Sequence, residues 1–229
     1  MKKKRMKTTP RLLCAIVLSV FGGPGAHAAG LELSDCEILI GKKSATAYQG
    51  WLRDNHKQAE AGDRDAIRLR AIEASNRLAC YEEQLTGDEG WGVIMTSADG
   101  TSESKEPAGI PDIRKQPAAW RALNQAVKFG HQAGAFDVGM KGASAELVTR
   151  YAADLPQQLD GAYEDAAAVY EFDCVLKRRF GRRDRDAGCA SARATRAKLI
   201  PLVPAARRQT LDASARLWAE RLPAVPKNQ

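Results

Sequence analysis

The stretch AIRLRAIEASNRLACYEEQL, residues 66–85, predicts the fold of this chain. Apolar side chains recur within it at alternating spacings of four and three residues, which is the period of one face of an α-helix. The members of this stripe are Ile67, Ala71, Ala74, Leu78, Tyr81 and Leu85. A helix of this kind is stabilised mainly by packing its apolar face, so we expect a partner helix nearby.

The partner helix is expected immediately upstream, over residues 34–56. Ser34 and Glu37 have the spacing of a capping box that would start it, although Gly41 weakens the helix near that end. Gly62 and Asp63 then carry the stop and cap signals between two helices. The two segments are therefore predicted to form an antiparallel helical hairpin.

The first 28 residues have the order of a secretory signal peptide. A basic segment precedes an apolar core, residues 12–21, and Ala26-His27-Ala28 is a small-x-small cleavage site. The core is too short to cross a bilayer, which takes about 20 residues. Cys14 lies inside it, whereas a lipoprotein would carry its cysteine after it. We therefore expect cleavage near Ala28 and a periplasmic or secreted mature chain without a transmembrane segment.

The cysteines of the mature chain fit an exported protein. Cys36 and Cys80 lie at the two hairpin ends that an antiparallel arrangement brings together. A catalytic thiol would need a companion histidine and a metal site would need close cysteine or histidine pairs, so we predict a disulfide, which exported proteins form and keep. Four cysteines allow three pairings. We prefer Cys36–Cys80 and Cys174–Cys189, because each joins neighbours in the sequence.

The charge of the mature chain is balanced in total but uneven along its length. The full chain has a net charge of +7, and the signal peptide carries six of its 35 basic residues and no acidic one. The mature chain therefore has 29 basic and 28 acidic residues, which argues against a nucleic-acid-binding protein. Residues 29–173 have a net charge of −9 and residues 174–229 a net charge of +10. This asymmetry indicates either an electrostatic partner or packing of the two halves on each other.

The segment KRRFGRRDR, residues 177–185, is the candidate interaction surface. Arginine suits bidentate contacts with carboxylate and phosphate groups, so the expected partner is a protein or an anionic component of the cell envelope. Basic residues in the last turn of a helix also complement its dipole, which would explain the first three without a partner. The candidate residues are Lys177, Arg178, Arg179, Arg182, Arg183 and Arg185.

The remaining sequence predicts a second, larger helical unit. Residues 87–117 are rich in Gly, Ser, Pro and charge, which is typical of a flexible linker or a long loop. Helices are predicted over residues 118–129, 143–155, 159–180 and 204–222. The predicted fold class is all-α, with a helical hairpin in residues 29–86 and a helical unit in residues 118–229, each stapled by one disulfide.

Motifs for common catalytic sites are missing from the sequence, so no catalytic residue, cofactor or metal ligand is predicted. His56 and His131, the two histidines of the mature chain, are interpreted as solvated or packing residues. Pairs of carboxylates can hydrolyse glycans, so an enzyme would require an acid that faces an enclosed pocket. The acids in question are Glu146, Glu164, Asp165, Glu171 and Asp173.

The run RLACY, residues 77–81, followed by Glu82 and preceded by Cys36 and Ile38, resembles a motif of small exported proteins. Among these are periplasmic accessory proteins of bacterial type VI secretion. The resemblance implies a disulfide-stapled helix pair in the periplasm. The resulting hypothesis is a non-catalytic protein for protein or envelope interactions, such as a secretion-system accessory. The alternatives are a lysozyme-like cell-wall hydrolase and an inhibitor or immunity protein.

Overall fold

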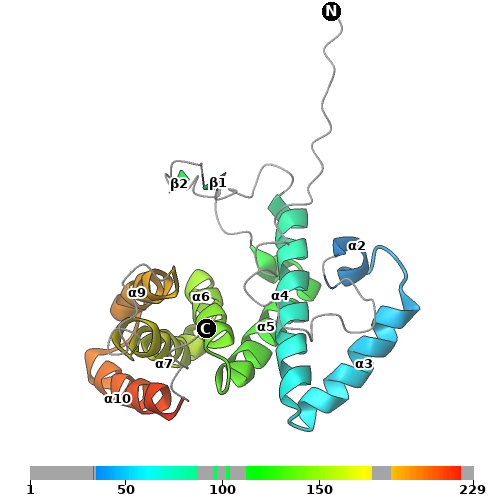
Figure 1. Cartoon of the computed structure of the whole chain (residues 1–229). Helices are drawn as coiled ribbons and strands as arrows, with labels where there is room; N and C mark the ends of the chain where they lie inside the picture. Colours follow the sequence, from blue (N-terminus) through cyan, green and yellow to red (C-terminus); the bar gives the residue numbers. More distant parts are fainter. Residues whose placement is uncertain are drawn as a thin grey trace, which may run out of the picture. The chain divides into compact units, whose positions relative to one another are not determined.

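The computed structural model describes residues 33, 35–86, 95–96, 102–103, 112–176 and 187–222 (Figure 1). The predicted all-α fold is confirmed: apart from two paired strands of two residues each, the regular elements of these residues are helical. Strand β1 (Met95–Thr96) pairs antiparallel with β2 (Ser102–Glu103). The signal peptide and most of the predicted linker lie outside the described residues.

The α-helices are α2 (Cys36–Leu39), α3 (Thr46–Glu60), α4 (Arg64–Thr86), α5 (Pro117–Gly134), α6 (Val138–Arg150), α7 (Leu159–Tyr170), α9 (Ala187–Leu199) and α10 (Ala205–Arg221). Short 3-10 turns are η1 (Ile113–Lys115), η2 (Pro156–Gln158) and η4 (Ile200–Leu202). The segment η3 (Glu171–Leu176) is a π-helix that continues directly from α7.

The described residues fall into two compact units. Unit 1 is drawn from Met1–Arg53 and Ser75–Ala122, and unit 2 from Asp54–Ala74 and Leu123–Gln229. Helices α3, α4 and α5 therefore contribute residues to both. The division of the mature chain into a hairpin of residues 29–86 and a helical unit of residues 118–229 stays a prediction.

The first predicted helix is two helices in the structure. Helix α2 begins after Asp35, whose carboxylate accepts hydrogen bonds from the backbone N–H groups of Glu37 and Ile38, whereas the predicted cap Ser34 lies outside the described residues. Gly41 follows α2 with a φ of +75°. A right-handed helix cannot continue through that conformation, so α3 starts anew at Thr46.

Helix α4 agrees closely with its prediction. Gly62 has a φ of +89°, and the Asp63 carboxylate accepts a hydrogen bond from the backbone N–H of Ala66 at 2.8 Å, so the expected stop and cap are both confirmed. Leu85 is the exception in the apolar stripe, since it is 41% exposed near the end of the helix. The other stripe residues, Ile67, Ala71, Ala74, Leu78 and Tyr81, are buried.

A disulfide between Cys36 and Cys80 joins α2 to α4 in unit 1, as predicted. The two Cα atoms are 5.4 Å apart across 44 residues of sequence. Cys80 is buried together with Leu39 and Tyr48, and the Tyr48 ring stacks on Trp51. The covalent bond therefore lies within the small apolar core of this unit.

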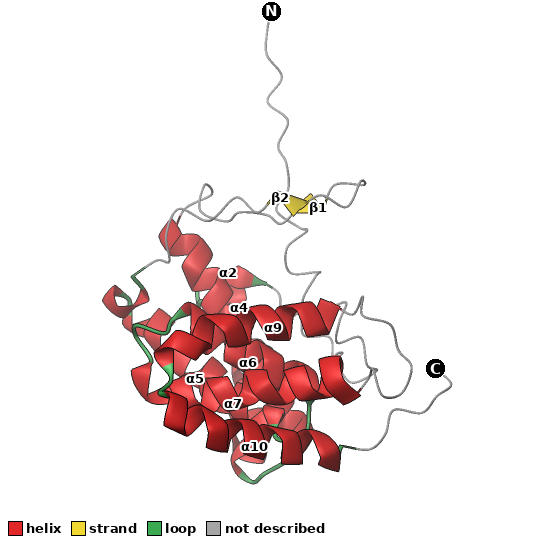
Figure 2. Cartoon of the chain, turned by 90° about the vertical axis from the view of Figure 1, so that its left-hand side faces the viewer, coloured by secondary structure: helices red, strands yellow, loops and turns green. Residues whose placement is uncertain are grey.

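Helix α7 is the centre of the C-terminal helices in unit 2. It packs against α6, α9 and α10, and Figure 2 shows α9 and α10 on either side of it. Its inward positions are mostly alanine, with Tyr163 as the one large ring among Ala162, Ala166, Ala167 and Ala168, all buried. Small side chains let the neighbouring helices approach closely. The second predicted disulfide, Cys174–Cys189, is also confirmed and joins η3 to α9.

Three helix boundaries in unit 2 differ from their predictions, and one of them is the end of α6, which comes at Arg150 and not at residue 155. Helix α5 continues to Gly134 and does not end at residue 129, because Gly130 and Gly134 face α6 and are not helix breakers here. A Cβ on Gly134 would lie 3.0 Å from the Cα of Lys141, so the glycine permits the close approach. Helix α6 begins five residues earlier than predicted, because the Asp137 side chain caps it through the backbone N–H of Met140.

The remaining predicted helices match in part. The helix predicted over residues 159–180 is α7 followed by η3, and residues 177–180 lie outside the described residues. Cys189 lies in the first turn of α9. Pro204 occupies the N-cap of α10.

The two disulfides should differ in their contribution to the free energy of unfolding. In the chain-entropy model, the 44-residue loop of Cys36–Cys80 is stabilised by about 4 kcal/mol and the 15-residue loop of Cys174–Cys189 by about 3 kcal/mol. We expect C36A/C80A to lower the urea midpoint of the mature chain more than C174A/C189A does. The fully reduced wild-type chain is the control and should be less stable than either variant. An equal or reversed order would contradict the loop-length argument.

Candidate functional site

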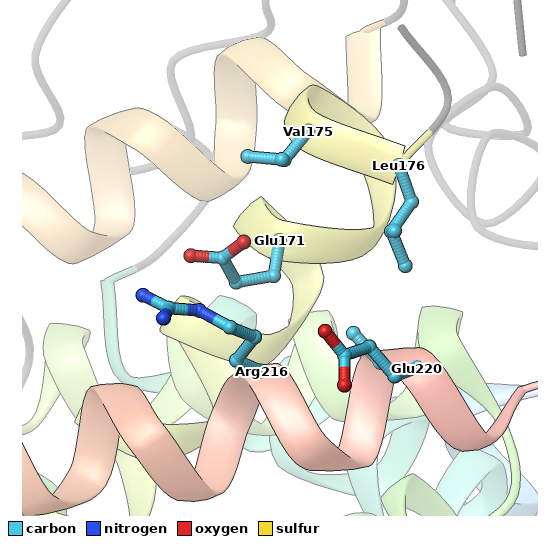
Figure 3. A pocket seen from close by; sticks show the side chains of 6 residues that line it. Glu171, Val175, Leu176, Arg216 and Glu220 are labelled. Carbon is cyan, nitrogen blue, oxygen red and sulfur yellow. The ribbon is translucent and has the colours of Figure 1, made fainter. Parts of the chain in front are cut away.

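A pocket of about 270 Å³ lies in unit 2 between η3 and α10 (Figure 3). Its charged lining residues are Glu171 on η3 and Arg216 and Glu220 on α10. Its apolar lining residues are Val175, Leu176 and Ala219. The pocket is partly open to solvent, so an approaching molecule can reach its charges.

The two walls of this pocket are built by different kinds of helix. Arg216, Ala219 and Glu220 are spaced by three and four residues, so they share one face of α10. The opposite wall comes from η3, and π-helical turns are frequent at functional sites. Cys174 in the middle of η3 is 2% exposed and is bonded to Cys189, which ties this wall to α9.

The charged groups of the pocket carry a net charge of −1. Figure 3 shows Glu171 and Arg216 directed toward each other from opposite walls, with the Glu220 carboxylate on the side of Leu176. None of the three makes a hydrogen bond or an ion pair with another side chain in the part of the chain that the structure describes. Their charges are therefore available to a ligand.

A second cluster of charges is buried and joins helices. Asp165 on α7 is 1% exposed; one of its oxygens accepts a hydrogen bond from Nζ of Lys141 on α6, which is 7% exposed. The other oxygen lies 3.1 Å from Nδ1 of His131 on α5. The Lys141 ammonium also lies 4.8 Å from the ring centroid of Trp218 on α10. A buried charge requires partners of this kind, so we interpret the cluster as a packing device.

His131 forms the outer end of this cluster. Its side chain is 60% exposed, and the hydrogen bond to Asp165 raises its pKa above the ordinary value of 6.5, against the opposing effect of burial. The nearby charges of Lys141 and Glu164 act in opposite directions on the same pKa, the first lowering it and the second raising it. The charged imidazolium is thus favoured, and it strengthens the bond between α5 and α7.

A third cluster joins α7, α9 and α10. Arg196 donates a hydrogen bond to Asp212 at 2.8 Å and another to the Tyr163 hydroxyl at 3.3 Å. Its guanidinium lies over the rings of Tyr163 and Tyr170, 5.7 and 5.3 Å from their centroids. Burial raises the pKa of Tyr163, so this side chain stays a neutral hydrogen-bonding group. The cluster bonds three helices through polar groups that face one another.

The five acids that sequence reasoning singled out have different surroundings in the structure. Glu171 lines the pocket, Asp165 is buried in its ion pair, and Glu164 accepts a hydrogen bond from the Ser214 hydroxyl at 2.6 Å. Glu146 is exposed and Asp173 is half-buried. Glu171 is the one of these five acids that lines the described pocket between η3 and α10.

The other predicted site residues have mixed outcomes. The basic candidates Lys177, Arg178, Arg179, Arg182, Arg183 and Arg185 lie outside the described residues. His56 packs its ring edge-on against Phe129 and pairs with Glu60, in agreement with a packing role. His131 is more than a solvated residue, since it completes the Asp165 cluster.

Sequence reasoning missed Lys141, Arg216 and Glu220. Lys141 carries a local signal, since it is the single charged residue between Asp137 and Glu146 in an otherwise small and apolar helix. Arg216 and Glu220 carry none, because a basic and an acidic residue four apart are typical of a solvated helix face. The pocket that they line depends on η3, which is separated from them by about 40 residues of sequence.

Comparison with known proteins identifies no relative. No protein-family model, no curated protein and no solved structure matches this chain. Within the described residues, no helix is long and apolar enough to cross a bilayer, and no group of three or more His, Cys, Asp or Glu side chains could hold a metal ion.

Removal of one partner from the buried Lys141–Asp165 pair should destabilise the chain strongly. Lys141→Met leaves the buried Asp165 carboxylate with His131 as its remaining described partner, and the expected loss of unfolding free energy is about 3 kcal/mol. The double variant K141M/D165L removes both charges and should lose much less than the sum of the two single variants. Denaturant unfolding measures all three. Lys115→Met, which breaks the exposed pair with Asp112, is the control and should change stability by less than about 1 kcal/mol.

The stability that His131 contributes should depend on pH. Because its folded-state pKa is raised above 6.5, this contribution is complete below pH 6.5 and is lost as the pH rises through the folded-state pKa. We therefore expect the difference in Tm between wild type and His131→Gln to be largest near about pH 5.5 and smallest near about pH 8.5. His56→Gln is the control and should keep the wild-type trend. A difference that grows with rising pH would contradict the assignment.

Proposed function

We propose that the mature chain is an exported, non-catalytic helical protein that binds a protein or an anionic component of the cell envelope. The observation that carries this proposal is that the charged groups of the chain serve two separate purposes. His131 and Tyr163, whose pKa values are raised, serve bonds between helices, whereas the pocket presents fixed charges on an open surface. Perturbed titration is typical of catalytic sites, but ion-pair networks within a fold also produce it.

Export is supported by two independent features. The first 28 residues have the pattern of a signal peptide, and both predicted disulfides are present in the structure. Disulfides persist in oxidising compartments such as the periplasm. The resemblance of residues 77–81 to the motif of periplasmic accessory proteins points to the same location.

The contact surface that we propose includes the basic segment of residues 177–185. The disulfide between Cys174 and Cys189 fixes the two ends of the chain on either side of this segment. Fixed ends reduce the number of conformations that the intervening residues can adopt, so less entropy is lost when they bind. Six basic residues in nine suit a partner with carboxylate or phosphate groups. A secretion-system accessory and an inhibitor or immunity protein are the kinds of binding protein that fit.

A cell-wall hydrolase is the second candidate function. One observation favours it: two carboxylates, Glu171 and Glu220, line the same pocket, and carboxylate pairs carry out glycoside hydrolysis. This candidate predicts the release of soluble fragments from purified peptidoglycan, and the loss of that activity in both Glu171→Gln and Glu220→Gln.

Affinity capture from an envelope extract tests the proposal. The mature wild-type chain should retain a defined partner, and R182E/R183E/R185E should lose it because three attractive charges become repulsive. A matched control, K42E/R53E/R121E, makes the same charge change at exposed positions elsewhere and should keep the partner. Once purified, the partner should bind the first variant at least about tenfold more weakly than wild type. Equal loss in both variants, or peptidoglycan fragments released by the wild type, would refute the proposal.

A further inference from the structure

The geometry of the pocket between η3 and α10 points to a specific ligand: the side chain of a lysine or arginine on a protein partner. This inference rests on the proposed function and deepens it, because it assigns a ligand class to the pocket that is separate from the basic segment. Three features lead to this ligand: the net charge of the pocket, the helix end beside it, and its size and lining.

The electrostatics of the pocket select a cation. Glu171 and Glu220 supply two negative charges and Arg216 one positive charge. One wall also lies near the C-terminal end of a helix, since α10 ends at Arg221. The last carbonyl groups of a helix carry partial negative charge, which favours a cation at that end. The net charge of −1 and the end of α10 therefore favour an ammonium or guanidinium group over a carboxylate or phosphate.

The size and lining of the pocket select one side chain. Its volume of about 270 Å³ lies just below the range of about 300–1,000 Å³ typical of pockets for drug-sized ligands. Val175, Leu176 and Ala219 offer apolar surface beside the two carboxylates. Lysine and arginine have this same composition, a hydrocarbon stem that packs on apolar surface and a charged head that stays with polar groups. A bare inorganic cation would leave the apolar part of the pocket unused.

The availability of the pocket charges supports binding over a packing role. In the described part of unit 2, other charged groups form ion pairs between neighbouring helices. Asp165 pairs with Lys141, and Arg196 pairs with Asp212. Glu171, Arg216 and Glu220 have no such partner among the described residues, although Glu171 and Arg216 are directed toward each other (Figure 3). An incoming ammonium or guanidinium would donate hydrogen bonds to the carboxylates of Glu171 and Glu220.

The inference is tested by titrating the methyl-labelled mature chain with Nα-acetyl-arginine amide and Nα-acetyl-lysine amide, followed by NMR. A ligand of this size should bind with a Kd of about 1 mM. We expect saturable shifts of the Val175 and Leu176 methyl signals. Nα-acetyl-citrulline amide has the shape of the arginine probe without its charge and should bind at least about tenfold more weakly, because the charge-assisted hydrogen bonds are lost.

A charge-neutral pocket variant completes this test. E171Q/E220Q should abolish the shifts, while E37Q/E146Q removes two exposed carboxylates elsewhere and should leave them unchanged. Equal shifts with citrulline, no shift with any probe, or shifts that persist in E171Q/E220Q overturn the inference. It is also overturned if the Val175 and Leu176 signals of R182E/R183E/R185E move without added ligand, because the pocket would then hold an arginine of the same chain.

The failure of this inference is distinguishable from the failure of the proposed function. If the envelope partner binds E171Q/E220Q as tightly as wild type, the ligand assignment fails and the binding function stands. If the probes bind the pocket but no envelope partner is retained, the pocket preference stands and the proposed function fails.

Discussion

The buried carboxylate of Asp165 joins three helices of unit 2. Asp165 on α7 is 1% exposed, and a charge at that depth is tolerated only where partners satisfy both of its oxygens. Lys141 supplies one partner from α6 and His131 supplies the other from α5, so one side chain fixes three helices. Lys141 reaches this position because Gly134 lets α5 and α6 approach closely, and the ring of Trp218 on α10 lies over its ammonium group. Loss of any of these features would leave a charge without its partner.

The sequence predicts those parts of the fold that local chemistry determines. The stripe of α4 and its Gly62–Asp63 start follow from spacing within short segments, and both disulfides follow from pairing cysteines that are neighbours in the sequence. The end of α5 does not, because Gly130 and Gly134 have the low helix propensity of a break, and only the position of α6 explains why they lie within a helix. The split of the first helix was signalled by Gly41, but its outcome depends on a backbone conformation that composition alone does not determine.

The candidate site is less predictable from the sequence than the fold is. Glu171 was one of five acids that could have faced a pocket, and no pattern separated it from Asp165, six residues away on the same helical segment. The difference arises from orientation: Asp165 faces α5 and α6, and Glu171 faces α10. His131 and Asp165 are 34 residues apart, so their pairing is a product of tertiary packing. Sequence periodicity indicates which face of a helix is apolar, but it does not indicate which element covers a polar residue.

Helix α10 connects the packing of unit 2 to its pocket. Asp212 and Trp218 bond it to the neighbouring helices, while Arg216 and Glu220 face the pocket. The opposite wall is held covalently, because Cys174 of η3 is bonded to Cys189 of α9. Both walls are thus fixed before any ligand arrives, so little conformational entropy is lost on binding. A small pocket with fixed walls can therefore favour a cation over a neutral group of the same shape, since only the cation gains charge-assisted hydrogen bonds with its two carboxylates.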